Sequence, residues 1–179
     1  MRQSQVRFEV ADGVTLVGDA WGAPEAPPVV LLTGAGQTRQ AWGHTGEALA
    51  AAGFMAVAVD HRGHGDSSWP TGDGAYGMEV FVDDTVTLCG HFERPVVVGA
   101  SLGGMAALMG IADRSAIDAR ALVLVSPVLE RATLDGAAGG RLCARLRVGP
   151  RATRGLEEHR QQPEGKYLQR AHGAVEPKP

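Results

Sequence analysis

The stretch PVVVGASLGGMAALMG, residues 95–110, decides the fold. Its valines, at 96–98, predict a buried strand, because β-branched side chains are stiff and pack well on a pleated sheet. The alanine-rich run that follows predicts a helix. Between the two lies the pattern G-x-S-x-G, from Gly99 to Gly103, whose glycines permit a sharp turn that holds the Ser101 hydroxyl clear of its neighbours. The sequence therefore presents Ser101 as a nucleophile at the amino end of a helix.

The composition of the 179 residues is that of one soluble globular domain, with 44% hydrophobic and 21% charged residues. No window approaches the length of a membrane span, and the amino end lacks the apolar core of a signal peptide. We therefore expect a cytoplasmic protein with no membrane partner. The two cysteines, Cys89 and Cys143, lie far apart and outside any C-x-x-C pattern, so we expect neither a disulfide framework nor a zinc site. Cys89 lies in an apolar helical stretch and is interpreted as a core residue.

The net charge of −3 combines two unlike parts of the chain. Residues 1–130 carry 7 basic and 15 acidic side chains, a net charge of −8, and residues 131–179 carry 10 basic and 5 acidic side chains, a net charge of +5. We therefore predict an α/β core over 1–130 and a basic tail over 131–179 that is irregular or partly helical. A basic tail suits acidic partners, but its aromatic content is limited to Tyr167, so we expect no nucleic-acid binding.

Further apolar runs predict the other strands and helices. The strands are expected over residues 6–10, 14–21, 29–32, 54–59 and 121–125, and the helices over 38–52, capped by Thr38, and 78–92. An Asp-Gly pair joins the first two strands and predicts a hairpin, while the later strands read as buried. Strands that alternate with helices imply an α/β fold, a mostly parallel sheet with helices on both faces. The ligand site of such a sheet lies at the carboxyl ends of its strands.

Three loops at those strand ends carry a family resemblance. They are LLTGAGQ at 31–37, DHRGHGDSS at 60–68 and GASLGG at 99–104. In this order, over roughly residues 6–128, they resemble the α/β-hydrolase superfamily, in its serine-nucleophile, esterase-like or perhydrolase-like branch. The three together are far more specific than the G-x-S-x-G pattern alone.

The resemblance implies a catalytic role for three residues. Ser101 is the implied nucleophile, and the backbone amides of Ala35 and Leu102 are the implied oxyanion hole. A small ester or related acyl substrate, an acyl-serine intermediate and no cofactor follow from it. Family dehalogenases and epoxide hydrolases use an aspartate at the nucleophile position, so a serine there points to acyl chemistry. Family members usually carry a histidine where this chain has Thr33, a change that bears on the shape of the loop.

The loop at 60–68 contains side chains of the types that bind metals. They are Asp60, His61, His64 and Asp66. The same residues match the loop motif of the family, so we expect no metal and a structural role. Arg62 is expected to pair with a carboxylate and to shape the wall of the site.

The rest of a catalytic triad is harder to find. A serine hydroxyl needs a histidine base and a carboxylate to orient it, in the chain order serine, acid, histidine. The histidines that follow Ser101 are His159 and His172. The acid candidates beside them are Asp135, Glu157, Glu158 and Glu164.

Residues 141–179 lack the apolar runs that two further buried strands require. We therefore predict that the late strands of the fold are missing, that its natural sequence stops near residues 130–140, and that a truncated or frame-shifted tail follows. The alternatives are a serine hydrolase whose base is His159 or His172, and a non-catalytic relative without a complete triad. Missing strands leave a sheet edge open, so we also expect self-association through that edge.

Overall fold

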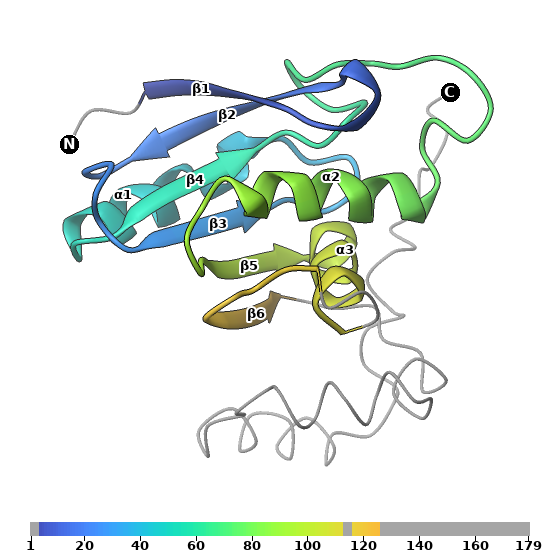
Figure 1. The fold of residues 1–179 in the computed structure, drawn as a ribbon. Coiled ribbons are helices and arrows are strands. Elements are labelled where there is room, and N and C mark those ends of the chain that lie inside the picture. Colours follow the sequence, from blue (N-terminus) through green and yellow to red (C-terminus); the bar gives the residue numbers. More distant parts are fainter. Residues whose placement is uncertain (1–3, 113–115, 126–179) are drawn as a thin grey trace, which may run out of the picture. The chain divides into compact units, whose positions relative to one another are not determined.

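The computed structural model describes residues 4–112 and 116–125, and the statements below concern these residues. They form one six-stranded sheet in the order β1-β2-β4-β3-β5-β6 (Figure 1). The strands are β1 Ser4–Glu9, β2 Thr15–Trp21, β3 Pro28–Leu32, β4 Met55–Val59, β5 Val96–Ala100 and β6 Ala121–Val125. The helices are α1 Gly43–Ala51, α2 Met78–Gly90 and α3 Ser101–Ala112, with the short 3₁₀ helices η1 Ala11–Gly13 and η2 Arg39–Trp42.

The directions of the strands agree with a mostly parallel sheet. β3 pairs in parallel with both β4 and β5, and β5 pairs in parallel with β6. β1 and β2 form the predicted antiparallel hairpin, and β2 is also antiparallel to β4. From β3 the chain passes to β4 on one side and then to β5 on the other, so the strand order reverses there. The carboxyl ends of β3 and β5 are therefore the place where an open α/β sheet binds ligands.

Helices cover both faces of the sheet, as predicted. Val30 of β3 belongs to an apolar cluster that includes Leu88 of α2, whereas its neighbour Leu31 belongs to a second cluster that includes Ala50 of α1. This alternation is the period of two expected of a strand that is buried on both faces. Figure 1 shows α2 and α3 on the near face and α1 on the far face.

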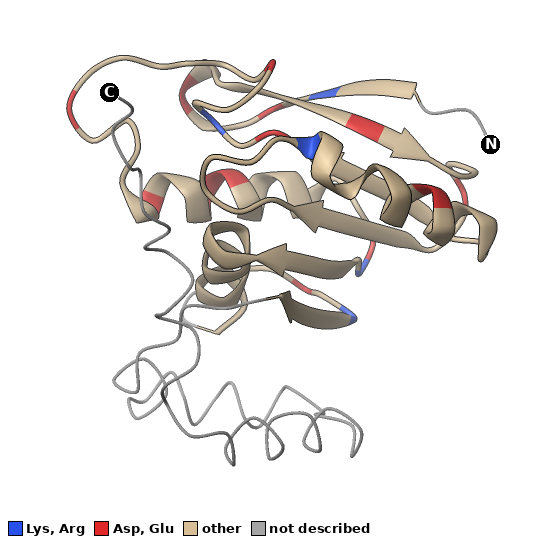
Figure 2. Cartoon of the chain, turned by 180° about the vertical axis from the view of Figure 1, so that it is seen from behind, with Lys and Arg blue, Asp and Glu red and all other residues tan. Residues whose placement is uncertain are grey.

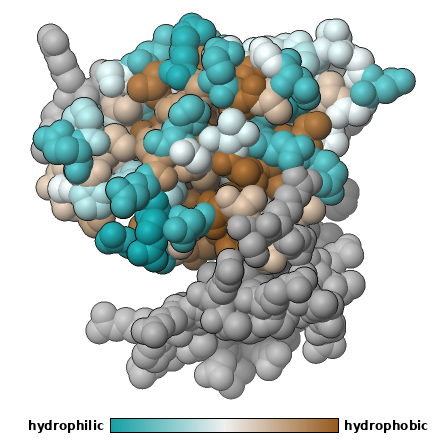
Figure 3. Space-filling view, in the orientation of Figure 1, coloured by the Kyte–Doolittle hydropathy of each residue, from teal (hydrophilic) through white to brown (hydrophobic). Residues whose placement is uncertain are grey.

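β6 is less buried than its apolar sequence predicts. Its residues alternate between exposed and half-buried, and Val123 and Val125 are 47% and 40% exposed. Within the described part of the chain, β6 is the last strand in the sheet order and pairs on one side only. The prediction of a buried strand is wrong for this reason, because an apolar run does not report which strands lie beside it. Figure 3 shows that hydrophobic side chains also reach the surface on the face seen in Figure 1.

The first helical segment also begins differently from the prediction. In place of one helix over 38–52, η2 is followed by α1, and Thr38 is extended and makes no side-chain capping bond. The amide of Arg39 donates instead to the Asp60 carboxylate, at 2.6 Å. A side chain from a distant loop thus takes the place of the local cap.

Acidic residues outnumber basic ones, 13 to 5, in the described part of the chain. Figure 2 shows the basic residues dispersed over strands, loops and helix ends. None of the described helices is long and apolar enough to cross a membrane. Residues 131–179 lie outside the described part, so the division near residue 130 and the basic tail stay predictions.

Candidate active site

The serine of the G-x-S-x-G motif lies at a sharp turn between a strand and a helix. β5 ends at Ala100 and α3 begins at Ser101, with no residue between them. Ser101 has a φ of +43°, in the left-handed region that costs a non-glycine residue about 1–2 kcal/mol. A strained serine in this position is the geometry of a nucleophile elbow.

The glycines around Ser101 allow close packing rather than an unusual backbone conformation. Gly99, Gly103 and Gly104 all lie outside the left-handed region. A Cβ atom on Gly99 would lie 2.5 Å from Cα of Gly104, and one on Gly103 would lie 2.6 Å from Cβ of Leu32. The sequence-based view that these glycines make the turn is therefore corrected. The strained residue is the serine, and the glycines let α3 pack directly on β5 and β3.

The loop after β3 makes a tight turn beside the serine. The Gln37 amide donates to the Gly34 carbonyl at 3.2 Å, and the Gly34 amide donates to Oε1 of Gln37 at 3.0 Å. Gly36 has a φ of +74°, as the third residue of a type II turn requires. A Cβ atom on Gly34 would lie 3.5 Å from Cβ of Ser101, so the turn lies close against the serine.

Within the described ranges, 4–112 and 116–125, two amides near Ser101 have no hydrogen-bond acceptor, one in this turn and one at the start of α3. They are the amides of Ala35 and Leu102, which the family resemblance implies as oxyanion donors. The amide that follows each of them in the chain is already bonded: Gly36 donates to a histidine ring, and Gly103 donates to the Thr33 carbonyl at 3.1 Å. The turn and the start of α3 therefore each present one open donor next to an occupied one.

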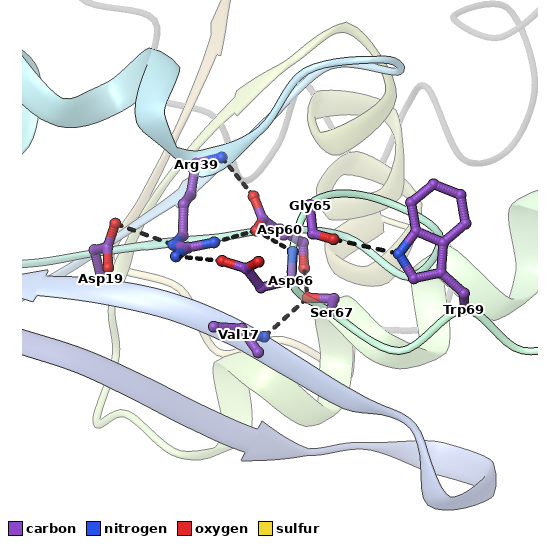
Figure 4. A network of polar contacts seen from close by, with 8 residues as sticks. All are labelled: Val17, Asp19, Arg39, Asp60, Gly65, Asp66, Ser67 and Trp69. Atoms are coloured by element: carbon purple, nitrogen blue, oxygen red, sulfur yellow. Dashed lines mark hydrogen bonds and ion pairs between the residues drawn. The ribbon is translucent and has the colours of Figure 1, made fainter.

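The loop after β4, residues 60–68, is held by the buried side chain of Arg39 (Figure 4). The guanidinium contacts three carboxylates, those of Asp19 at 3.0 Å, Asp66 at 2.8 Å and the fully buried Asp60. Burial lowers the pKa of Arg39, but hydrogen bonds to Asp66 and Asp60 outweigh it, so the pKa is raised. Sequence reasoning missed Arg39, because its partners lie 20, 21 and 27 residues away and leave no local pattern.

A second buried arginine fixes the same loop to α2. Nε and Nη2 of Arg62 donate to the two carboxylate oxygens of Asp84, each at 2.6 Å. The predicted pairing of Arg62 with a carboxylate is confirmed. These hydrogen bonds raise the pKa of Arg62, so the arginine stays charged inside the protein.

Two histidines of the loop contact the backbone of the turn after β3. Nε2 of His61 lies 3.2 Å from the Thr33 carbonyl oxygen, and Nε2 of His64 lies 2.9 Å from the Gly36 amide nitrogen. His61 is fully buried, and burial, more than the neighbouring His64, lowers its pKa to about 4. Among the residues described, no three His, Cys, Asp or Glu side chains come together as a metal site.

The structure does not bring a base to Ser101 within its described part. His44 is fully exposed in α1 and His91 packs against the Phe8 ring, while the two histidines of the loop contact the glycine turn. His159 and His172, the candidates for the base, lie outside the described residues. So do the candidates for the acid, Asp135, Glu157, Glu158 and Glu164.

Several curated proteins and solved structures similar to this chain are named as hydrolases, lipases or thioesterases, and one is named a non-heme chloroperoxidase. Epoxide hydrolase A of Mycobacterium tuberculosis is 37% identical over 101 residues, which cover 55% of this chain and 31% of the relative. Monoacylglycerol lipase of Mycolicibacterium smegmatis is 34% identical over 113 residues, 57% of this chain and 39% of the relative. The structure of a thioesterase domain from the curacin biosynthetic pathway has a TM-score of 0.67 and 26% identity, over 80% of this chain and 52% of that one.

This chain thus spans 31% and 39% of the two curated relatives and 52% of the thioesterase domain. The sequence profile of a family described as "Serine aminopeptidase, S33" matches residues 24–166. The match continues past 130–140, where we predicted that the natural sequence of the fold stops. The chain belongs to this family of the α/β-hydrolase superfamily.

Proposed function

We propose that the protein is a serine hydrolase that cleaves a small ester or a related acyl substrate. The observation that carries the proposal is the strained Ser101 beside a turn whose Ala35 amide, together with the Leu102 amide, is open. Such donors stabilise the negative oxygen of a tetrahedral acyl intermediate, and each is worth about 3 kcal/mol of barrier. The geometry therefore favours attack on a carbonyl carbon.

The reaction divides into two acyl transfers. The Ser101 oxygen bonds to the carbonyl carbon while a base takes the hydroxyl proton, and the alcohol leaves with that proton as the C–O bond breaks. Water then attacks the acyl-serine, and the acid product and the free serine result. No cofactor takes part in these steps. We propose His159 or His172 as the base.

Ester cleavage fits this chain better than epoxide opening. One relative is named an epoxide hydrolase and another a monoacylglycerol lipase. Members of the superfamily that open epoxides use an aspartate nucleophile, and this chain has Ser101 at that position. A serine beside open amides suits the acyl chemistry of the lipase.

Mass spectrometry after treatment with a fluorophosphonate tests the proposal on the full chain. We expect one adduct on the wild-type protein and none on Ser101→Ala, because an activated serine displaces fluoride from the phosphorus centre. Ser4→Ala removes an exposed serine of β1 and serves as the matched control, which keeps the adduct. A wild-type protein that is folded by circular dichroism yet forms no adduct would contradict the proposal and favour a non-catalytic relative.

The same measurement identifies the base. If His159 or His172 takes the serine proton, its replacement by alanine slows the labelling by at least about a hundredfold, in line with the loss of general-base catalysis. Labelling that is unchanged in both variants would exclude both histidines as the base.

A further inference from the structure

The ring of His64 bridges two backbone groups whose hydrogen-bonding roles are fixed. Nδ1 lies 2.9 Å from the Arg62 carbonyl oxygen, and Nε2 lies 2.9 Å from the Gly36 amide nitrogen. A carbonyl oxygen only accepts and an amide only donates, so Nδ1 carries the proton and Nε2 offers its lone pair. The geometry thus selects the neutral tautomer of His64 with hydrogen on Nδ1.

The amide that His64 accepts belongs to the central peptide of the turn after β3. Type I and type II turns differ in the orientation of this peptide, and the φ of +74° at Gly36 corresponds to type II. An acceptor aimed at the Gly36 amide therefore holds the turn in its type II form. The preceding peptide carries the Ala35 amide and is joined to the central peptide at Ala35, so an anchored Gly36 amide limits how far the Ala35 amide can be displaced.

Both histidines of the loop contact this part of the chain, His61 just before the turn and His64 at its central peptide. His61 contacts the Thr33 carbonyl, next to the end of β3, and His64 contacts the amide of Gly36. His64 is itself anchored through the carbonyl of Arg62, whose side chain is bound to α2. The turn is thus connected to the core by side chains of a loop that follows a different strand.

We propose that His64 is a positioning residue for the oxyanion hole. Its Nε2 lone pair fixes the Gly36 amide and so directs the Ala35 amide at the acyl oxygen. The inference rests on the proposed function where it concerns reaction rate. The hydrogen bond itself is independent of that function.

Two substitutions of His64 distinguish the loss of its hydrogen-bond acceptor from the loss of its ring volume. In His64→Gln, the side-chain Oε1 can occupy the place of Nε2 and accept from Gly36, whereas His64→Leu fills similar space without an acceptor. His44→Leu makes the same change at an exposed histidine of α1 and serves as the matched control. A role in packing alone predicts similar results for the first two variants.

Nuclear magnetic resonance of the ¹⁵N-labelled full chain measures the hydrogen bond without any substrate. We expect a scalar coupling between the Gly36 amide nitrogen and Nε2 of His64, and protonated Nδ1. Exchange of the Gly36 amide with solvent should be about tenfold faster in His64→Leu, as the loss of one hydrogen bond implies, and unchanged in His64→Gln and His44→Leu. Unchanged exchange in His64→Leu would overturn the proposal.

The rate of fluorophosphonate labelling then tests the positioning role. We expect His64→Leu to react about tenfold more slowly than wild type, and His64→Gln and His44→Leu to react at close to the wild-type rate. Equal losses in the Leu and Gln variants, or none in either, would overturn the proposal. An unreactive wild-type protein would refute the proposed function instead, and the exchange of the Gly36 amide would still decide whether His64 holds the turn.

Discussion

Two buried arginines hold the loop at 60–68, and they do so in different ways. Arg39 reaches three carboxylates, one on β2 and two on the loop, whereas Arg62 makes a two-point contact with the single carboxylate of Asp84 on α2. Figure 4 shows the guanidinium of Arg39 at the centre of its three partners. One arginine is the hub of a network, and the other is half of a pair.

Because of this difference, the ion pairs of the two arginines respond differently to replacement by apolar side chains. A buried pair can be exchanged for two apolar side chains of similar size at little cost, because both charges leave together. Arg39 does not allow this exchange, because it has three carboxylate partners. If Arg39 is removed, the buried carboxylates of Asp19 and Asp60 remain, while the mostly exposed Asp66 is solvated by water.

The largest effect is expected from Arg39→Met. Removing one member of a buried ion pair costs about 3–5 kcal/mol, and we expect Arg39→Met at the upper end and Arg62→Met at the lower end of that range. The double variant Arg62→Met/Asp84→Leu should recover most of its loss, and Arg39→Met/Asp60→Leu should not. Urea unfolding measures the four free energies. Equal recovery in the two double variants would show that Arg39 is no hub.

A smaller effect separates two glycines of the same loop. A Cβ atom on Gly65, which has a φ of +48°, would overlap the carboxylate of Asp60, whereas one on Gly63, with a φ of +68°, would meet the ring of the exposed Tyr76. Both alanine variants pay about 1 kcal/mol for the left-handed conformation. We expect Gly65→Ala to lower the free energy of unfolding by about 3 kcal/mol in total, because the Arg39 network cannot move aside. We expect Gly63→Ala to lower it by about 1 kcal/mol, because the exposed ring of Tyr76 can move aside.

The free energies of unfolding of the two variants, each measured against wild type, show whether the Arg39 network is more rigid than the exposed ring. Similar costs at Gly63 and Gly65 would mean that the Arg39 network yields as easily as an exposed ring. The comparison of the two arginines would then lose its physical basis.

The sequence predicts the sheet well and its surroundings poorly. Each strand is a short run of β-branched or other apolar residues, a local signal that gives the six strands within a few residues. The exposure of β6 depends on which strands flank it, and that information is not in the run. The expected cap at Thr38 failed for a related reason, since a distant carboxylate binds the next amide.

The residues of the candidate site also divide into those with a local sequence signal and those without one. The G-x-S-x-G motif marks Ser101 from local sequence alone, and the resemblance to the superfamily adds Ala35 and Leu102. The contacts of Arg39 with its carboxylates and of His64 with the Gly36 amide join residues 20 to 28 positions apart, which no local pattern reports. The motif also does not report the strain at Ser101, because its glycines by themselves account for a sharp turn.

His61, the residue before Arg62 in the chain, has a buried side chain in which burial disfavours the charged form. Burial lowers the pKa of His61 to about 4, while an unfolded chain gives a histidine a pKa of about 6.5. The unfolded state therefore binds the proton first, and stability falls as the pH drops below about 6.5, until His61 is protonated in both states below pH 4. Between pH 7 and pH 5 this contribution amounts to about 2 kcal/mol.

His61→Gln tests that contribution, because glutamine keeps a donor for the Thr33 carbonyl and does not titrate. We expect urea unfolding of this variant to lose about 2 kcal/mol less between pH 7 and pH 5 than wild type does. His44→Gln, at an exposed histidine, is the control and should follow wild type. If His61→Gln also followed wild type, acid would act on the loop elsewhere. The loop would then differ from our description, in which Arg39 and Arg62 stay charged because they are paired with carboxylates, and His61 stays neutral because burial disfavours its charge.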